Sequence, residues 1–201
     1  MKDTYKTIAY PSPEIIYKEK SSLFYGYAFP IETEIGIKPI LETLRKKHPQ
    51  AVHYCYAYQL GAESIQYRAN DDGEPTNTAG LPIYRQIQSF SLTNILIVVV
   101  RIFGGIKLGV GGLISAYKTT AQLTLDTCQI IEKTINIHYE ITFDYKNMNK
   151  VMRIIKEKNI TIKKQEMGMS CKIEIIVQKK NAAIVFEIFD SMFEIAIKDV
   201  L

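Results

Sequence analysis

Three carboxylates fall within four positions of a loop-forming stretch, and they are the first residues that could carry chemistry. The segment NDDGEPTNTAG (residues 70–80) places Asp71, Asp72 and Glu74 among Gly, Pro and Thr. Carboxylates this close repel one another, so they need a counter-charge, a metal ion or full solvation. They could hold a hard cation such as Mg²⁺, or one could act as a general base. The residue types favour a structural alternative, in which Asp and Thr bond the backbone and cap the next helix.

A glycine-rich stretch after a strongly apolar run could hold an anion. In VRIFGGIKLGVGGL (residues 100–113), five glycines lie within nine positions, between a predicted strand and a predicted helix. Glycines let the backbone approach a ligand closely, and the free N–H groups of a helix N-terminus favour negative charge. We expect Lys107 and Arg101 to add mobile positive charge. The predicted anion or nucleic-acid site comprises Arg101, Gly104, Gly105, Lys107, Gly109, Gly111 and Gly112.

This stretch completes neither of the common nucleotide-binding motifs. No Gly-Lys-Ser/Thr sequence is present, so it is not a Walker loop, and Ile114 stands where the dinucleotide fingerprint has its last glycine. We therefore expect no cofactor. The alternative is a tight strand-to-helix connection, but five glycines and a lysine exceed what such a turn requires, which favours the anion site.

A histidine and a cysteine lie two positions apart in HYCYAY (residues 53–58). On a strand, His53 and Cys55 would share a face. A Cys–His nucleophile pair is conceivable, but the sequence identifies no third group that would orient the base. We favour a structural, hydrogen-bonded histidine. The catalytic candidates are Asp71, Asp72, Glu74 and His53, and whether the chain is an enzyme stays open.

Apolar periodicity predicts the elements that position these residues. In the first part of the chain we predict strands over 25–31, 52–60 and 94–103, and helices over 35–47, 78–90 and 113–128. Thr78 is expected to cap the second helix. The inward positions of the third helix are expected to be Leu113, Ala116, Tyr117, Thr120 and Leu123.

The pattern changes near Glu132–Thr134, and we place a domain boundary there, which gives domains 1–132 and 133–201. In the second domain the expected order is strand, helix, strand, strand, helix, strand. The strands are predicted over 135–143, 161–166, 172–178 and 194–197, and the helices over 147–158 and 181–189. This order is the ferredoxin-like plan.

Composition is ordinary for a globular protein and excludes few partners. The hydrophobic share is 47%, and the net charge of +4 permits a polyanionic partner without requiring one. Cys55, Cys128 and Cys171 are odd in number and form no CxxC pair, which argues against a disulfide framework or structural zinc and fits a reducing cytosol. The apolar run Ile95–Val100 is too short to span a membrane, and the N-terminus shows no signal-peptide core. We expect a cytoplasmic protein without membrane contacts.

Three blocks, HYCYAY, NDDGEPTNTAGLP and VRIFGGIKLGVGGLISAY, resemble in order and spacing the signature of the IMPACT/YigZ family. The second half is similar to the small C-terminal domain of bacterial members, so the resemblance covers nearly the whole chain. It implies an α+β, two-domain fold. The first domain would be a βαβ sandwich similar to domain 2 of ribosomal protein S five, with a left-handed crossover. The second would be ferredoxin-like, similar to the C-terminal domain of elongation factor G.

The family has no settled activity in bacteria, so competing functions stay open. The first hypothesis is a non-catalytic binder of RNA or the ribosome, acting in translation or its control. The second is an enzyme on a small phosphorylated or nucleotide substrate, which requires the acidic loop to lie near the glycine loop. The third is a protein-interaction module with an unknown partner, marked by an exposed apolar sheet face in the second domain. Leu23 and Ser115 stand where family members usually carry basic residues, which weakens the case for nucleic acid.

Overall fold

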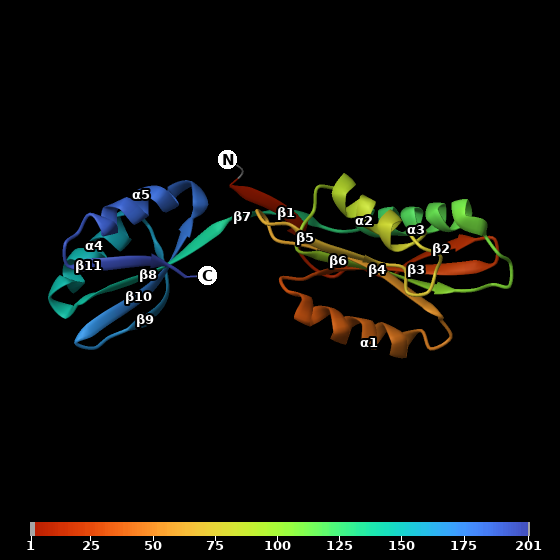
Figure 1. Cartoon of the computed structure of the whole chain (residues 1–201), viewed down its shortest axis with the longest axis horizontal. Coiled ribbons are helices and arrows are strands. Elements are labelled where there is room, and N and C mark those ends of the chain that lie inside the picture. Colours follow the sequence, from red (N-terminus) through yellow and green to blue (C-terminus); the bar gives the residue numbers. More distant parts are fainter. Residues whose placement is uncertain (1–2, 201) are drawn as a thin grey trace. The chain divides into compact units, whose positions relative to one another are not determined.

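A five-stranded antiparallel sheet organises the first of two units (Figure 1). The computed structural model describes residues 3–200. Tyr5–Lys133 form this first unit, and residues 134–200, with residues 3 and 4, form the second. The order across the sheet is β2 (Ile15–Glu19), β3 (Ser22–Pro30), β6 (Ile95–Ile102), β4 (His53–Leu60) and β5 (Gln66–Asn70).

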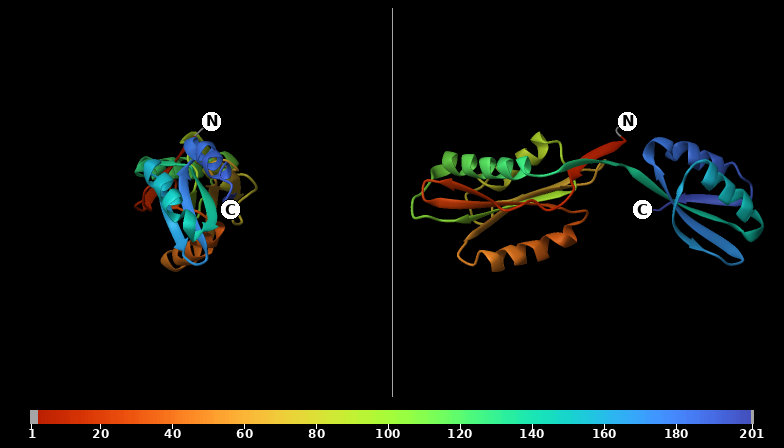
Figure 2. Two further views of the ribbon diagram at one scale, coloured as in Figure 1. Left: turned by 90° about the vertical axis from the view of Figure 1, so that its left-hand side faces the viewer. Right: turned by 180° about the vertical axis from the view of Figure 1, so that it is seen from behind.

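The central strand β6 explains the layered arrangement. Its alternate side chains enter two separate cores, and the six from Ile95 to Val100 are fully buried. Ile95, Ile97 and Val99 pack under α2 (Gly80–Ser89) and α3 (Gly109–Asp126). Leu96, Val98 and Val100 pack against α1 (Ile37–Lys47) on the other face (Figure 2). A β-branched run buried on both faces is typical of a central strand, and the predicted strand is confirmed.

Two helical connections cross this sheet, and they must have opposite hands. β3 and β4 are both antiparallel to β6, so they are parallel to each other and α1 joins them. β5 and β6 are both antiparallel to β4, and α2 joins them. Compared with the first connection, the second joins strands that point the opposite way, and it crosses the sheet in the opposite direction. These two reversals together leave the hand unchanged. Its helix, however, covers the opposite face of the sheet, which reverses the hand. One crossover is therefore left-handed, against the usual rule, as the family resemblance implied.

Four strands in the first part of the chain have no sequence pattern that predicts a strand. Two of them, β2 and β5, form the edges of the sheet and have the polar, partly exposed sequences IIYKE and QYRAN. The other two, β1 (Thr4–Ile8) and β7 (Ile130–Thr134), pair with each other in a two-stranded sheet. An edge strand packs little apolar surface, so it lacks the alternation that identifies a strand in a sequence.

Two details of the predicted third helix are wrong. The helix begins at Gly109, so three of the five glycines are helical and the connecting loop ends at Leu108. Leu123 is 39% exposed, whereas Thr124 and Leu125 are buried. Position 123 lies six residues after the buried Tyr117, which is well off that face at 3.6 residues per turn, whereas 124 completes two turns.

The second unit has the ferredoxin-like order of elements and sheet. Its sheet order is β11, β8, β10, β9, with all pairs antiparallel. The elements are β8 (Asn136–Asp144), α4 (Met148–Glu157), β9 (Thr161–Glu166), β10 (Ser170–Gln178), α5 (Lys179–Asp190) and β11 (Ile195–Asp199). Short 3₁₀ turns, η1 (Glu34–Gly36) and η2 (Tyr145–Asn147), precede α1 and α4. Within residues 3–200, no helix is both long and apolar enough to cross a membrane.

Candidate functional site

The acidic loop and the glycine-rich stretch open into one pocket of the first unit, with a volume of about 530 Å³. This volume suits a small ligand. Its polar lining consists of His53, Glu74, Arg101 and Lys107. Its walls are otherwise apolar, formed by Val52, Pro75, Phe103, Leu108, Val110 and Leu113. The acidic loop therefore lies near the glycine-rich stretch, as the hypothesis of a small phosphorylated or nucleotide substrate requires.

A buried ion pair forms one side of this pocket. Nη1 of Arg101 lies 2.6 Å from Oε1 of Glu74, and both residues are at most 9% exposed. The alternation that buries Ile97 and Val99 carries Arg101 onto the same face, which explains why it needs a buried partner. The expectation of a mobile Arg101 is therefore wrong. Its Nε is buried and has no hydrogen-bond partner among residues 3–200.

Tyr117 extends the ion pair into a hydrogen-bonded chain. Its hydroxyl donates to Oε1 of Glu74 at 2.8 Å and accepts from the Cys55 thiol at 3.3 Å. Burial raises the pKa of Tyr117 above its ordinary range, so the phenol stays neutral and can donate. Burial also raises the pKa of Cys55, which leaves that thiol protonated. A protonated, buried thiol is a poor nucleophile, which argues against a Cys55–His53 nucleophile–base pair.

Asp71 has a structural role at the start of α2. Its Oδ1 accepts the backbone N–H groups of Ala79 and Gly80 at 3.0 and 2.8 Å, and its Oδ2 accepts that of Asn77 at 2.9 Å. Asp71 thus has the structural role that the alternative interpretation of this loop predicted. It caps α2 although it lies eight residues before Ala79. The prediction that Thr78 caps the helix is wrong, because its hydroxyl donates to the Pro75 carbonyl at 2.6 Å.

Asp72 orients His53. The carbonyl oxygen of Asp72 lies 2.8 Å from Nδ1 of His53, while its carboxylate accepts the N–H of Tyr54 at 2.7 Å. This carbonyl is the orienting group that the sequence could not identify. Nε2 of His53 lies 4.0 Å from Oε1 of Glu74, at the polar end of the pocket.

The three carboxylates of the acidic loop do not converge. Asp71 faces backbone amides, the Asp72 carboxylate faces Tyr54 and the Arg45 guanidinium at 3.5 Å, and Glu74 faces Arg101. Separate partners relieve the mutual repulsion expected from their spacing. Among residues 3–200, no three His, Cys, Asp or Glu side chains form a group that could hold a metal ion.

The predicted anion site divides into a loop and a helix start. Gly104 packs so closely that a Cβ would lie 1.8 Å from the Ser21 carbonyl oxygen, which requires glycine. Gly105 lies in the same loop, and Gly109 begins α3 with φ +73°. Gly112 follows in the first turn, where a Cβ would touch the Leu108 side chain at 3.1 Å. At Gly111, by contrast, a Cβ would meet nothing within 4 Å, so packing within the chain does not require glycine there.

Among residues 3–200, no side-chain acceptor is found for the first N–H groups of α3, whereas Asp71 accepts those of α2. The N-cap residue of α3 is Leu108, with no side-chain capping bond. The first N–H groups of a helix have no intrahelical acceptors, so they are available to an anion. Lys107 is exposed beside this turn and forms no ion pair within the described part of the chain. Of the predicted anion-site residues, the structure therefore brings Arg101, Lys107 and Gly109 together in the lining of the pocket.

Sequence reasoning missed the residues that complete the pocket. Tyr117 was predicted only as an inward position, and the apolar rim of Val52, Phe103 and Val110, which are 62%, 46% and 60% exposed, was not predicted. A tyrosine among the small inward residues of α3 was the available signal for Tyr117. The rim had none, because its members come from three separate segments.

Known proteins match both the sequence and the fold. The Impact N-terminal domain family matches residues 20–125. The IMPACT family member YvyE of Bacillus subtilis is 31% identical over 180 residues, which cover 90% of this chain and 82% of that protein. YigZ of Escherichia coli is 36% identical over 120 residues, 59% of each chain.

Two solved structures align as well. A crystal structure of a hypothetical protein covers 100% of this chain and 99% of its own, with a TM-score of 0.78 and 25% identity. The structure of the two-domain translational regulator Yih1 covers 59% of this chain and 46% of its own, with a TM-score of 0.37 and 21% identity. The family match over residues 20–125 and the coverage of YvyE together establish that this chain belongs to the IMPACT family.

Proposed function

We propose that the first unit binds a small anionic ligand, a phosphorylated molecule or nucleotide, in the pocket between the acidic loop and the start of α3. The observation that carries this proposal is the buried Arg101, which lines the pocket with an unpaired Nε and lies near a helix N-terminus without a side-chain cap. A phosphate would interact with the free N–H groups of α3 and with Lys107. The apolar walls would enclose the rest of the ligand.

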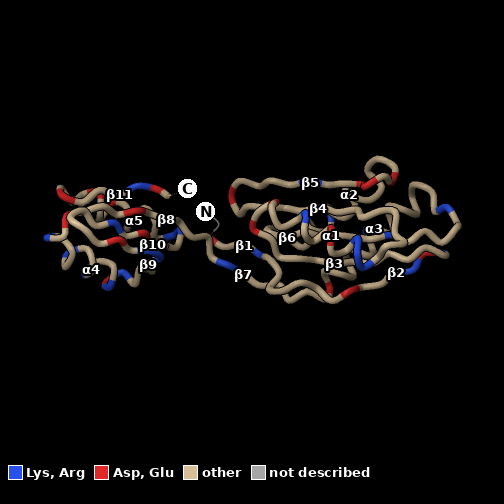
Figure 3. Tube along the Cα trace, turned by 90° about the horizontal axis from the view of Figure 1, so that it is seen from below, with Lys and Arg blue, Asp and Glu red and all other residues tan. Residues whose placement is uncertain are grey.

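The charge distribution supports a confined ligand over a long polyanion. Basic and acidic positions alternate along both units in the part of the chain that is drawn (Figure 3). Arg101, one of the two cations expected to contact nucleic acid, is neutralised by Glu74. The outer face of the second unit's sheet carries paired charges, Lys198 with Glu140 and Lys163 with Glu174. That face therefore lacks the apolar character expected of the protein-interaction hypothesis.

Calorimetric titration with inorganic phosphate and with AMP tests the proposal. We expect saturable binding to the parent protein and weaker binding to Lys107→Ala. Gly111→Ala is a second probe, because it adds a methyl group in the first turn of α3, where packing within the chain leaves room for it. Arg101→Ala is unsuitable, since it would leave the buried Glu74 without its partner.

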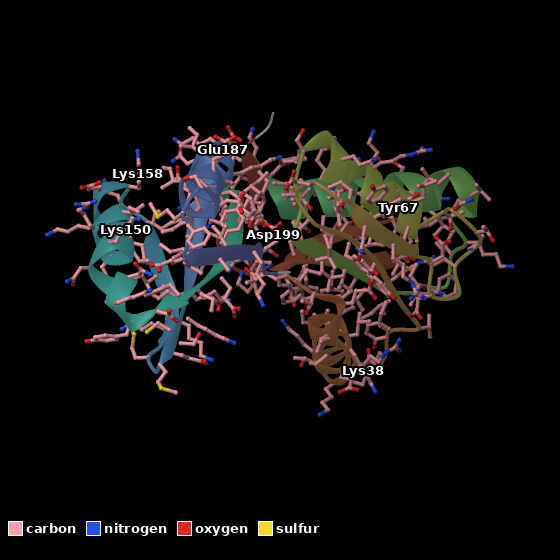
Figure 4. The ribbon with its side chains drawn as sticks, turned by 60° about the vertical axis from the view of Figure 1, so that its left-hand side comes forward. Lys38, Tyr67, Lys150, Lys158, Glu187 and Asp199 are labelled. Carbon is pink, nitrogen blue, oxygen red and sulfur yellow. The ribbon has the colours of Figure 1, made fainter. Side chains whose placement is uncertain are left out.

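The matched control is Lys38→Ala, because Lys38 projects from α1 on the other face of the sheet (Figure 4). It removes the same charge at a distance from the pocket and should bind like the parent. No binding of either ligand, or equal binding by all four proteins, would contradict the proposal. Proton transfer by His53 or Glu74 is a separate question that binding does not answer.

The second candidate is a cytoplasmic binder of RNA or the ribosome, linked to translation or its regulation. The observation in its favour is the Phe103 ring, which is 46% exposed at the rim of the pocket, with the Arg101 guanidinium carbon 5.4 Å from its centroid. An exposed aromatic ring beside a phosphate site can stack one base of a single strand. Binding of an RNA oligonucleotide should then fall steeply with salt and in Phe103→Ala. Retained AMP binding without RNA binding would reject this candidate alone.

A further inference from the structure

Two hydrogen-bond acceptors face the pocket at its polar end. A carbonyl oxygen can only accept, so the 2.8 Å contact from His53 Nδ1 to the Asp72 carbonyl places the hydrogen of the neutral ring on Nδ1. Nε2 then carries a lone pair. It lies 4.0 Å from Oε1 of Glu74, which is beyond hydrogen-bonding distance. Because Oε1 already accepts from Arg101 and Tyr117, the oxygen of Glu74 left for a ligand donor is Oε2.

The charge of this site favours a neutral donor over a cation. Glu74 is already compensated by Arg101 at 2.6 Å, and Lys107 adds a further positive charge to the lining. A ligand ammonium group would therefore bring excess positive charge into a partly buried site, which is unfavourable. Hydroxyl groups can donate without that penalty. One hydroxyl has a single hydrogen, so satisfying both acceptors takes two hydroxyls.

We propose that the ligand is a phosphorylated sugar whose adjacent hydroxyl groups donate to Nε2 of His53 and to the Glu74 carboxylate. The inference rests on the proposed phosphate site and adds the chemistry of the ligand's other end. Adjacent hydroxyls carry their two donors on neighbouring carbons, which suits one acceptor on each of two side chains that approach to 4.0 Å at Nε2 and Oε1. The apolar walls between the two polar ends suit the C–H faces of a sugar ring.

Two classes of ligand have this chemistry: a nucleotide, and a sugar phosphate without a base. Both present a phosphate and neighbouring hydroxyls. The exposed ring of Phe103 would contact a base, so a nucleotide would gain affinity that a simple sugar phosphate would not. The two classes can therefore be distinguished by affinity.

The experiment compares hydroxyl and deoxy ligands by calorimetry on the full chain. The pairs are ribose 5-phosphate with 2-deoxyribose 5-phosphate, and AMP with 2′-deoxy-AMP, with inorganic phosphate as the common reference. We expect the hydroxyl ligand to bind about tenfold more tightly, because the deoxy ligand leaves a partly buried acceptor unpaired. This comparison needs no variant, so it does not depend on a substituted protein folding.

His53→Asn then tests which residue reads the hydroxyl. The asparagine amide can still donate to the Asp72 carbonyl, but the acceptor at Nε2 is lost. We expect this variant to lose the tenfold preference and to keep its affinity for inorganic phosphate, while Lys38→Ala retains both. Tighter binding of AMP than of ribose 5-phosphate would identify a nucleotide as the ligand, and equal binding would identify the sugar phosphate.

Failure of the sugar inference can be distinguished from failure of the proposed phosphate site. Equal affinity for hydroxyl and deoxy ligands, with phosphate still bound, would overturn the inference and leave the proposed phosphate site standing. A preference that survives in His53→Asn would also overturn it. If neither sugar ligands nor inorganic phosphate bind, the proposed function and the inference both fall.

Discussion

At the residue scale, the pair of Arg101 and Glu74 is the feature that sets this site apart from the surrounding core. It occupies a sheet face that is otherwise filled by Ile95, Ile97 and Val99. Oε1 of Glu74 accepts from both Arg101 and Tyr117. A buried ion pair stabilises a protein little compared with apolar residues of similar size, but removing one partner is costly. The presence of such a pair is therefore weak evidence of a stabilising role.

Glu74→Ala should lower the free energy of unfolding by about 3–5 kcal/mol, because it leaves Arg101 charged and buried without its partner. Urea denaturation followed by circular dichroism measures this loss. Tyr117→Phe should cost about 1–2 kcal/mol, since it removes the hydrogen bond to Glu74 and the acceptor of the Cys55 thiol but leaves the ion pair in place.

The control for this prediction is the double substitution Glu74→Leu with Arg101→Met. Replacing both charges by apolar groups should recover most of the stability lost in the single variant and abolish phosphate binding. A double variant as unstable as Glu74→Ala would show that packing around the pair, and not its charge, determines the loss.

At the element scale, the two helices on this face begin differently. α2 is capped by Asp71, whereas α3 begins after Leu108 with no side-chain cap. A remote carboxylate fixes the first turn of α2 in place of a local Ser or Thr. The uncapped turn of α3 leaves N–H groups for an anion. The acidic loop thus stabilises one helix and, through Glu74, lines the pocket beside the other.

Asp71→Ala should destabilise the first unit by about 1–2 kcal/mol, because three backbone N–H groups lose their acceptor. Asp71→Asn keeps one acceptor oxygen and should lie between the parent and alanine. Denaturation and amide exchange at Gly80 measure the effect. An unchanged exchange rate at Gly80 in Asp71→Ala would show that the cap is dispensable.

The C-terminal end of α1 carries a second cluster of titratable groups. Nε2 of His48 lies 2.6 Å from the Tyr27 hydroxyl, which donates to Glu14, and Lys47 lies 2.7 Å from the same carboxylate. Burial lowers the pKa of His48 below its ordinary value of 6.5. The hydrogen bond from Lys47, followed by that from Tyr27, lowers the pKa of Glu14 below 4.5. Lowering the pH therefore reduces the stability contributed by each of the two groups.

Stability should fall as the pH drops, in two steps. The unfolded chain binds a proton at His48 more readily than the folded chain, so this contribution is present above pH 6.5 and is lost as the pH falls below it. The contribution of Glu14 is lost only below pH 4.5. We expect His48→Gln to flatten the first step by less than about 1 kcal/mol, since the charged neighbours Glu14 and Lys47 are partly exposed to solvent. Urea midpoints measured at about pH 7.5 and about pH 5.5 give this difference.

His48→Gln is compared with Lys38→Ala, which lies on the same helix and should keep the slope of the parent between those two pH values. A variant that retains the full pH dependence would assign it to other groups. The test is separate from the pocket, because His48 packs with the α1 face of the sheet, where its ring lies 4.4 Å from that of Tyr25.

At the scale of the whole molecule, the candidate site belongs to one unit. All of its lining residues lie between Val52 and Leu113, within Tyr5–Lys133. The second unit has its own core, built on Ile141, Ile173 and Phe189. Separate cores allow each unit to fold and act independently.

A fragment comprising residues 5–133 should fold alone and bind phosphate ligands with the dissociation constant of the full chain. Circular dichroism verifies the fold, and calorimetry compares the affinity with the intact protein. A folded fragment that binds more weakly would show that residues outside the first unit contribute to the site.

The sequence by itself determined the elements with strong apolar periodicity, the order of the ferredoxin-like unit, and the two stretches that form the pocket. It did so because burial on one side gives α4 a helical period, because burial on both faces gives β6 a continuous β-branched run, and because glycine clusters and clustered carboxylates are unusual locally. Edge strands such as β5 were not predicted, since a half-exposed strand needs little apolar sequence.

Only the tertiary structure decided which residue meets which. The partner of Arg101 lies 27 positions away, the cap of α2 comes from Asp71 rather than Thr78, and His53 is oriented by a backbone carbonyl with no sequence signature. Pairings over such distances depend on strand register and on the face that each side chain occupies, which no local pattern encodes. The carboxylates of the acidic loop are adjacent in the chain, yet the fold gives them separate tasks: Asp71 caps α2, and Glu74 lines the pocket.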